Sequence, residues 1–244
     1  MRGGSIHLFR FAGIDVFLHF SWFFVALYQL TSQSHGYRSS IFALYEYLAL
    51  FLIVLLHEFG HAFACRQVGG IADRILLWPF GGIAFVRPPH RPGAELWSIV
   101  AGPLVNVILF PILFGARLLF WSTGLGYSMP DIYLLLDWIG NINLFILIFN
   151  LMPVYPLDGG QILRSLLWFA LGPIKSLRVA SIIGLVGGGA LALYAFTTGS
   201  MLFILMTFFL LSQAIAGWKQ AQAMQLQADE MARPAPAPVP PPLP

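Results

Sequence analysis

The sequence predicts an all-α polytopic membrane protein with six transmembrane helices and a small membrane-associated β-hairpin between the second and third helices. Only 9% of the 244 residues are charged, against about 25% in a typical soluble domain, and 58% are hydrophobic. The mean hydropathy is correspondingly high, at +0.79. Six apolar stretches approach the roughly 20 residues that a helix needs to cross a bilayer. Lysine and arginine also gather on one side of these stretches, as they do in multi-pass membrane proteins.

The predicted spans begin close to the amino terminus. The first stretch follows two arginines and has no small-residue cleavage site behind it, which favours a retained span over a removed signal peptide. A seventh apolar piece, Ile162–Leu171, is interrupted by Arg164 and is expected to be too short to span. The six predicted spans are Ile14–Leu30, Ile41–Ala64, Leu96–Trp121, Ile132–Met152, Val179–Phe196 and Met201–Trp218.

The positions of the cations predict a cell-membrane protein with both termini in the cytoplasm. Of the 13 lysines and arginines, all but Arg38 and Arg117 fall at the two termini or after the second and fourth spans. Cytoplasmic loops carry the excess of these residues in multi-pass proteins. The lipid bilayer is therefore the first expected partner of this chain.

Two segments depart from the helical pattern. Between the second and third spans, short β-rich runs at Ile75–Trp78 and Ile83–Val86 flank Pro79–Gly82, which predicts a hairpin. After Met231 the sequence RPAPAPVPPPLP is expected to be extended. We therefore expect one integral-membrane domain over residues 1–224, a disordered proline-rich tail over residues 225–244, and no appended soluble domain.

The composition excludes several classes of function. A chain with so few charges has too little polar surface for a soluble enzyme of this size. No run of basic residues forms the patch that nucleic-acid binding needs, so no nucleic-acid partner is expected. The single cysteine, Cys65, excludes an internal disulfide framework and is expected to be unreactive.

The second predicted span ends in HEFGH, which places three ionisable side chains inside one apolar helix. Residues four apart lie on the same helical face, so His57 and His61 can reach one ion. Glu58 then lies near the water that this ion would hold. This is the HExxH pattern of zinc metalloproteases, in which the glutamate is the general base. The alternative is a pair of buried histidines satisfied by neighbouring groups, which would leave Glu58 buried without a cation.

A catalytic zinc takes three protein ligands and one water, so a third ligand must come from elsewhere. His57 and His61 lie near the cytoplasmic end of their span, and the partner should lie at the same depth. Asp158 does, in a segment where two prolines prevent a regular helix. The alternative role for Asp158 is to cap the following helix. The candidates for this ligand are few: the acids within or near the spans are Asp15, Glu46, Asp137 and Asp158, and the remaining histidines are His7, His19, His35 and His90.

The remaining acids have weaker claims. Asp15, with His19, is expected in a wet interhelical contact of the first span. Glu46 and Asp137 are expected towards the outer side, in packing or water access.

HEFGH together with the later NLMPVYPLDGG resembles the site-2 protease family of intramembrane zinc metalloproteases, whose signatures are HExxH and NxxPxxPxDG. PFGGIA and AGPLVN between them also resemble that family, and the similarity covers residues 10–220. The resemblance implies one Zn²⁺ per chain bound by His57, His61 and Asp158, with Glu58 activating the water. It also implies a transmembrane protein as substrate.

Further site residues follow from the same resemblance. Asn150 takes the family's asparagine position, where it could polarise the scissile carbonyl or instead form an interhelical hydrogen bond. Asn106 could hold the site or the substrate, or serve packing alone. Gly81 and Gly82 match the family's membrane-embedded hairpin, whose open edge could accept an extended substrate as an added strand.

Two other functions compete with proteolysis. A multi-pass metal-ion transporter would also carry intramembrane histidines and acids, but it predicts polar residues strung across the membrane and has no need of HExxH spacing. A catalytically dead membrane chaperone would not keep every expected catalytic residue. The sequence leaves the oligomeric state open, a homo-oligomer included.

Overall fold

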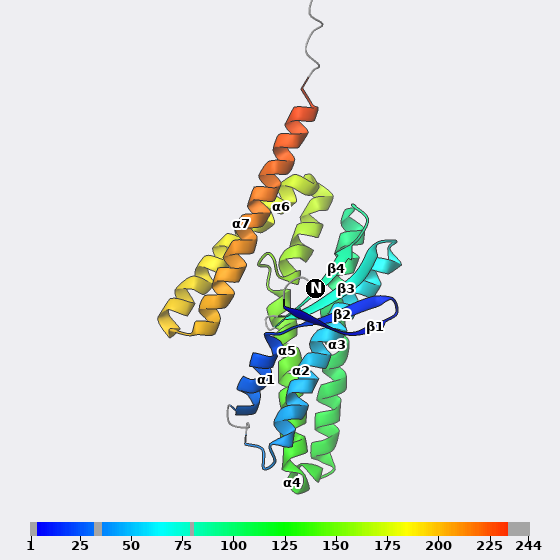
Figure 1. Ribbon diagram of the computed structural model, residues 1–244, viewed down its shortest axis with the longest axis vertical. Helices are drawn as coiled ribbons and strands as arrows, with labels where there is room; N and C mark the ends of the chain where they lie inside the picture. Colours follow the sequence, from blue (N-terminus) through cyan, green and yellow to red (C-terminus); the bar gives the residue numbers. More distant parts are fainter. Residues whose placement is uncertain (1–3, 32–35, 79–80, 234–244) are drawn as a thin grey trace, which may run out of the picture.

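The computed structural model describes residues 4–31, 36–78 and 81–233 of the chain. This part is mostly helical and contains one small sheet (Figure 1). The strands are β1 (Ser5–Phe11), β2 (Ile14–His19), β3 (Ile71–Trp78) and β4 (Gly81–Arg87). The helices are α1 (Trp22–Thr31), α2 (Ile41–Gln67), α3 (Pro92–Ser122), α4 (Leu125–Ser128), α5 (Pro130–Leu151), α6 (Asp158–Thr198) and α7 (Met201–Met231).

Four helices in the described part are long and apolar enough to cross a membrane, namely α2, α3, α5 and α6. They contain or closely match the predicted second, third, fourth and fifth spans. The apolar first half of α7 coincides with the predicted sixth span, Met201–Trp218. The chain is thus a mostly helical membrane protein.

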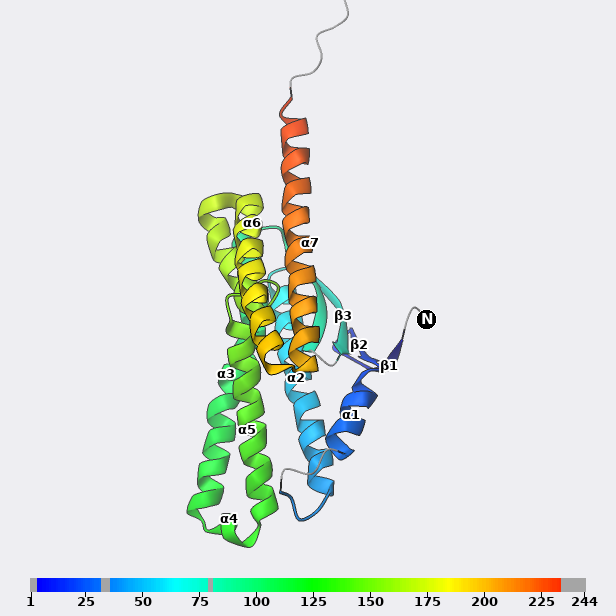
Figure 2. The ribbon, with the colours of Figure 1, turned by 90° about the vertical axis from the view of Figure 1, so that its left-hand side faces the viewer.

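The helices form two groups (Figures 1 and 2). In the first group α2, α3 and α5 lie side by side, with α4 joining α3 to α5 at one end and the sheet at the other. In the second group α6 and α7 form a long antiparallel pair, and the end of α7 extends beyond the rest of the molecule on the side away from α4.

The helix α6 bends at Gly172, whose φ of 78° and ψ of 171° are not helical. Pro173 follows immediately and cannot continue the helical hydrogen bonding. This divides α6 into a first segment, residues 158–171, and a second segment, residues 173–198. The first segment contains the apolar piece that the sequence predicts to be too short to span.

The four strands form one sheet in the order β1-β2-β3-β4. The outer pairs are antiparallel, and β2 and β3 are parallel neighbours. One face of the sheet packs on the carboxyl-terminal half of α2, where both contribute to a buried core. This core comprises Ile14, Val16, Leu18, Trp22, Val54, Leu55, Phe59, Ala62, Cys65, Ala72, Ile75 and Leu77.

The predicted first span, Ile14–Leu30, is wrong. Residues 14–19 are strand β2, and α1 has ten residues, which give about 15 Å of helix against a hydrocarbon core of about 30 Å. In β2 buried and partly buried residues alternate, which is the period of a strand packed on one face. A turn at Ala12 and Gly13, both with positive φ, connects β2 back to β1.

Because that span is absent, the expected interhelical contact of Asp15 and His19 is also wrong. Both residues lie in β2. Oδ1 of Asp15 lies 3.2 Å from Nε2 of His7 and 3.8 Å from Nε of Arg10, both in β1. His19 instead lies 2.5 Å from the hydroxyl of Ser21.

Two further boundaries differ from expectation. The predicted hairpin is present as β3 and β4, but both strands are longer than predicted and belong to a four-stranded sheet rather than standing alone. Residues 225–231, expected in the disordered tail, are helical because α7 continues to Met231. Pro79 of the predicted turn and residues 234–244 of the tail lie outside the described residues.

Candidate metal centre

The last turns of α2 bury three ionisable side chains beside the sheet. His57, Glu58 and His61 are 4%, 5% and 8% exposed. The two imidazoles lie on one face of the helix, with their rings 4.8 Å apart between centroids. Burial of this kind requires a partner for each group, and the partners come from three other elements, α3, α6 and β4.

The first partner is Asp158 at the beginning of α6. Its Oδ2 lies 3.0 Å from Nε2 of His57 and 3.4 Å from Nε2 of His61, and the two Nε2 atoms are 3.1 Å apart. Ligand atoms about 2.0–2.1 Å from a tetrahedral zinc would be about 3.3 Å from one another. These three residues form a group that can hold a metal ion, although His57 and Asp158 are 101 positions apart in the sequence.

The outer nitrogens of both imidazoles are also engaged. Nδ1 of His61 donates to the backbone oxygen of Ser98 at 2.9 Å, and Nδ1 of His57 donates to Oδ1 of Asn106 at 2.6 Å. A neutral imidazole with its proton on Nδ1 presents a lone pair at Nε2. Two such lone pairs and a carboxylate oxygen therefore converge without a proton between them, which is the donor set of a cation site.

A buried amide pair orients His57. Asn106 on α3 and Asn143 on α5 are both 0% exposed. Nδ2 of Asn106 donates to Oδ1 of Asn143 at 2.8 Å, and Nδ2 of Asn143 donates to the backbone oxygen of Asn106 at 3.0 Å. This reciprocal pairing leaves Oδ1 of Asn106 to accept from His57. The pair thus joins α2, α3 and α5 at the depth of the metal group.

Glu58 is held by the sheet rather than by the helices. The backbone N–H of Ala84 donates to Oε2 of Glu58 at 2.9 Å, so this N–H of β4 points away from β3. A Cβ on Gly82 would lie 2.4 Å from Cδ of Glu58. A side chain at position 82 would therefore displace the Glu58 carboxylate from this position.

Close packing of α2 on α3 fixes the second imidazole. A Cβ on Gly102 would lie 2.2 Å from Nε2 of His61, and one on Gly60 would lie 2.6 Å from the backbone oxygen of Ala101. These contacts bring α2 and α3 into close packing at Gly60 and Gly102. They set the His61 ring directly against the backbone of α3.

The segment that carries Asp158 is anchored to α3 as well. Arg164, in the first segment of α6, pairs with Glu95 near the start of α3 at 3.5 Å, and both side chains are largely buried. His90 lies 3.8 Å from the other oxygen of Glu95. This ion pair holds the first segment of α6 beside the helix that orients both histidines.

The arrangement of these residues agrees with the comparison to known proteins. The family model described as Peptidase family M50 matches residues 45–194, which is more than half of the chain and includes the three metal-group residues and Glu58. The chain belongs to peptidase family M50. This confirms the resemblance to the site-2 proteases drawn from HEFGH and NLMPVYPLDGG.

The chain is also similar to individual proteins along much of its length. It is 34% identical over 207 residues to a zinc metalloprotease of Methanocaldococcus jannaschii, across 84% of this chain and 58% of that protein. It is 34% identical over 146 residues to stage IV sporulation protein FB of Bacillus subtilis, across 59% of this chain and 44% of that protein. The chain therefore spans about half the length of these relatives.

A solved structure has the same overall arrangement. The site-2 protease from Methanocaldococcus jannaschii aligns with a TM-score of 0.62 at 29% sequence identity. The alignment covers 88% of this chain and 95% of that one. The M50 fold thus accounts for nearly the whole described chain.

The other predicted site residues lie at different positions around this group. Asn106 contacts His57, and Gly82 contacts Glu58, as described above. Gly81 begins β4 with a φ of 137°. Asn150 is half-buried in the last turn of α5, and its catalytic role stays a prediction.

Ser98, Asn143 and Ala84 contact the site but were not predicted. Asn143 had a usable signal, since a buried amide in a transmembrane helix is costly without a partner. Ser98 and Ala84 act through backbone atoms, which no side-chain pattern reveals.

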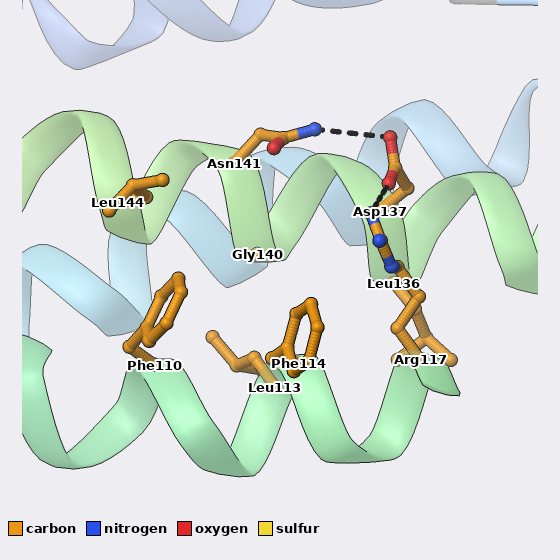
Figure 3. Close-up of a pocket in the computed structure, with 9 residues that line it drawn as sticks. All are labelled: Phe110, Leu113, Phe114, Arg117, Leu136, Asp137, Gly140, Asn141 and Leu144. Atoms are coloured by element: carbon orange, nitrogen blue, oxygen red, sulfur yellow. Dashed lines mark hydrogen bonds and ion pairs between the residues drawn. The ribbon is translucent and has the colours of Figure 1, made fainter. Parts of the chain in front are cut away.

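A second polar cluster lies away from the metal group, between α3 and α5 towards α4. Figure 3 shows Arg117 reaching Asp137, whose other oxygen accepts from Nδ2 of Asn141 at 3.0 Å. The surrounding recess is otherwise apolar and includes Phe110, Phe114 and Leu144. The cluster accounts for Asp137 as part of helix packing. Glu46, the other acid expected on this side, accepts from the hydroxyl of Tyr37 at 3.0 Å.

Replacing Asn106 with alanine is expected to weaken zinc binding by about 10- to 100-fold, because partners behind a ligating histidine contribute this much to metal affinity. Competition with a zinc-selective fluorescent chelator measures the change. Asn141→Ala is the matched control, since Asn141 lies in the distant Asp137 cluster. Equal loss in both variants would mean that the effect is on folding rather than on His57.

Proposed function

We propose that this chain is an intramembrane zinc metalloprotease that hydrolyses peptide bonds within or near the transmembrane helices of other membrane proteins. The observation that carries the proposal is the convergence of His57, His61 and Asp158 beside Glu58 on helices apolar enough to span a membrane. The family membership supports the same chemistry. So does the likeness to relatives named as a zinc metalloprotease and as a site-2 protease.

The catalytic steps assign Glu58 to proton transfer. Zinc bound by His57, His61 and Asp158 would supply Lewis-acid polarisation of the scissile carbonyl and acidification of a water molecule. Glu58 takes the proton of the attacking water and then passes it to the nitrogen of the leaving amine. The N–H of Ala84 keeps the Glu58 carboxylate aimed beside the metal group through this cycle. Asn150 donates its amide N–H to the developing oxyanion.

The substrate is proposed to bind as an extended strand along the free edge of β4. In an antiparallel strand alternate N–H groups point to the same side, so the N–H groups of Gly82 and Val86 point the same way as that of Ala84, away from β3. A strand added here would pass directly by Glu58. Gly81 leaves room for its backbone, because a Cβ there would have no other atom within 4 Å. A substrate helix must first unwind, so helices with Gly, Pro or polar breakers are the preferred substrates.

Replacing Val86 with proline is expected to raise KM about 5-fold, because one substrate hydrogen bond of about 1 kcal/mol is lost at the edge of the sheet. Steady-state cleavage of a peptide substrate in detergent gives KM and kcat separately, and kcat should stay within twofold. Zinc content is the control for an intact site. An unchanged KM in a fully metallated variant would argue against binding at the β4 edge.

We further propose a multi-pass arrangement with the sheet and the metal group towards the cytoplasm. The sheet lies beside the end of α2 that is away from α4, and α7 ends on that side too (Figure 1). Most lysines and arginines also belong to the segments at that end. Both termini are then cytoplasmic, with α7 as a further span, because β2 and the short helix α1 lead from the sheet towards the opposite end, where α2 begins (Figure 1).

Transport and proteolysis predict different results in sealed vesicles. The metal-ion transporter is not supported by the relatives, and among the described residues the only group placed to hold a metal ion is His57, His61 and Asp158, with the Asp137 cluster separate from it. Purified chain in vesicles that contain a single-span substrate helix should produce two fragments, identified by mass spectrometry, without zinc uptake above empty vesicles. Zinc uptake without cleavage would overturn the proposed function.

A further inference from the structure

The loop between α5 and α6 carries a large aromatic side chain three residues before Asp158. Tyr155 lies in this loop, residues 152–157, and burial raises the pKa of its phenol above the ordinary value. The ring is therefore uncharged at neutral pH. None of the catalytic steps assigned above uses Tyr155.

The loop and the beginning of α6 form one tightly packed unit. A Cβ on Gly160 would lie 2.3 Å from the backbone nitrogen of Tyr155, and one on Gly159 would lie 2.3 Å from the backbone oxygen of Leu151. The side chain of Gln161 donates to the backbone oxygen of Pro156 at 2.9 Å. A displacement of Tyr155 must therefore displace Asp158, which lies within this unit.

Tyr155 is seated against glycines of the α6–α7 pair. A Cβ on Gly217 of α7 would lie 2.9 Å from Cε1 of Tyr155. A Cβ on Gly184, in the second segment of α6, would lie 2.5 Å from the backbone oxygen of Tyr155 and 3.2 Å from its Cβ. A Cβ on Gly187 would lie 2.6 Å from Cγ2 of Val154, the residue before Tyr155. Side chains at these three glycine positions would overlap the loop.

The metal group has one ligand whose position depends on this seat. His57 and His61 share the helix α2 and are each held by α3. Asp158 comes from a separate element, α6. The ion pair of Arg164 with Glu95 anchors the first segment of α6 to α3 six residues after Asp158. Before Asp158, the loop packs against the α6–α7 pair through Tyr155 and Val154.

We propose that Tyr155 is a positioning residue that fixes Asp158 opposite His57 and His61 by docking its loop into the glycine-lined seat on α6 and α7. This inference rests on the proposed zinc site. It makes the α6–α7 pair part of the metal centre, because a shift of these two helices is transmitted through Tyr155 to a metal ligand. The role requires the volume of the ring and not its hydroxyl group.

Metal binding by three purified variants tests this role without any substrate. Tyr155→Ala is expected to raise the apparent Kd for zinc at least tenfold, within the range for residues that support metal ligands. It should also change the visible absorption of the cobalt-substituted chain, which reports coordination geometry. Tyr155→Phe should restore both. The matched control is Tyr194→Ala, which removes a half-exposed tyrosine near Phe203 in the same helix pair.

A second variant covers the case in which Tyr155→Ala does not fold. Gly217→Ala keeps the tyrosine but adds a methyl group against its ring, and it is expected to raise the zinc Kd severalfold. The positioning role would be overturned, and the zinc site left intact, if Tyr155→Ala had the zinc affinity and the cobalt spectrum of wild type. If only Gly217→Ala folds, the same result in that variant would overturn it. A wild-type chain that binds no zinc would instead overturn the proposed function.

Discussion

Replacing Glu58 with glutamine is expected to lower the rate of peptide-bond hydrolysis by about 10²- to 10⁴-fold, the usual contribution of a general acid–base group. Glutamine keeps the length and hydrogen-bonding oxygen of the side chain, so the contact with the N–H of Ala84 can persist. It cannot take a proton from water at neutral pH. Cleavage of a single-span substrate in liposomes, measured from initial rates, gives the size of the loss.

The control for Glu58→Gln is its metal content. Because Glu58 is outside the metal group of His57, His61 and Asp158, the variant should bind as much zinc as wild type. Hydrolysis at the wild-type rate by a fully metallated variant would contradict the role of Glu58 as general base. Loss of both zinc and activity would instead show that Glu58 supports the metal site.

Replacing Asp158 with alanine is expected to remove zinc from the purified chain almost completely. The change removes one of the three protein ligands, and the two that remain are neutral imidazoles with no carboxylate beside them. Zinc content should fall from about one per chain to near zero after dialysis against a weak chelator, with hydrolysis lost in parallel. Elemental analysis by mass spectrometry measures this directly.

Asp131→Ala provides the matched control for Asp158→Ala. The Asp131 side chain is half-buried and accepts from the backbone N–H groups of Arg38 and Ser39 near the opposite end of the molecule. This variant should keep its zinc. Retention of a full zinc equivalent by Asp158→Ala would mean that another residue supplies the third ligand.

The two histidines of the metal group were easier to predict from the sequence than its aspartate. His57 and His61 share a face because four residues make about one helical turn, which is a local property of any helix. Asp158 lies far away in sequence, and apart from the family resemblance only its expected depth and the broken helix before it indicated that it belongs to the site. The structure brings all three together through the packing of α2, α3 and α6.

The first strands could not be recovered by counting apolar residues. Residues 14–30 are apolar enough for a span, yet Ile14, Val16 and Leu18 are buried at every second position, in a strand. What stabilises β2 is its parallel pairing with β3, more than 50 residues later in the chain. Such long-range pairing leaves no local signal beyond the alternation itself.

The partners of the site were the least predictable part. Asn143 is a buried amide whose only reason for burial is its pairing with Asn106, so it becomes meaningful once both helices are placed. The seat of Tyr155 depends on glycines from two helices that follow it in sequence. Glycines in a transmembrane helix indicate close packing, but they do not identify the group that fills the space.

The central claim is that one zinc ion held by His57, His61 and Asp158 enables this chain to hydrolyse peptide bonds inside a membrane. The most direct test follows cleavage of a spanning substrate helix by the purified chain in liposomes, before and after removal of its metal. Cleavage should disappear when zinc is stripped and return when about one equivalent is added back. Undiminished cleavage by a chain with no detectable metal would contradict the account.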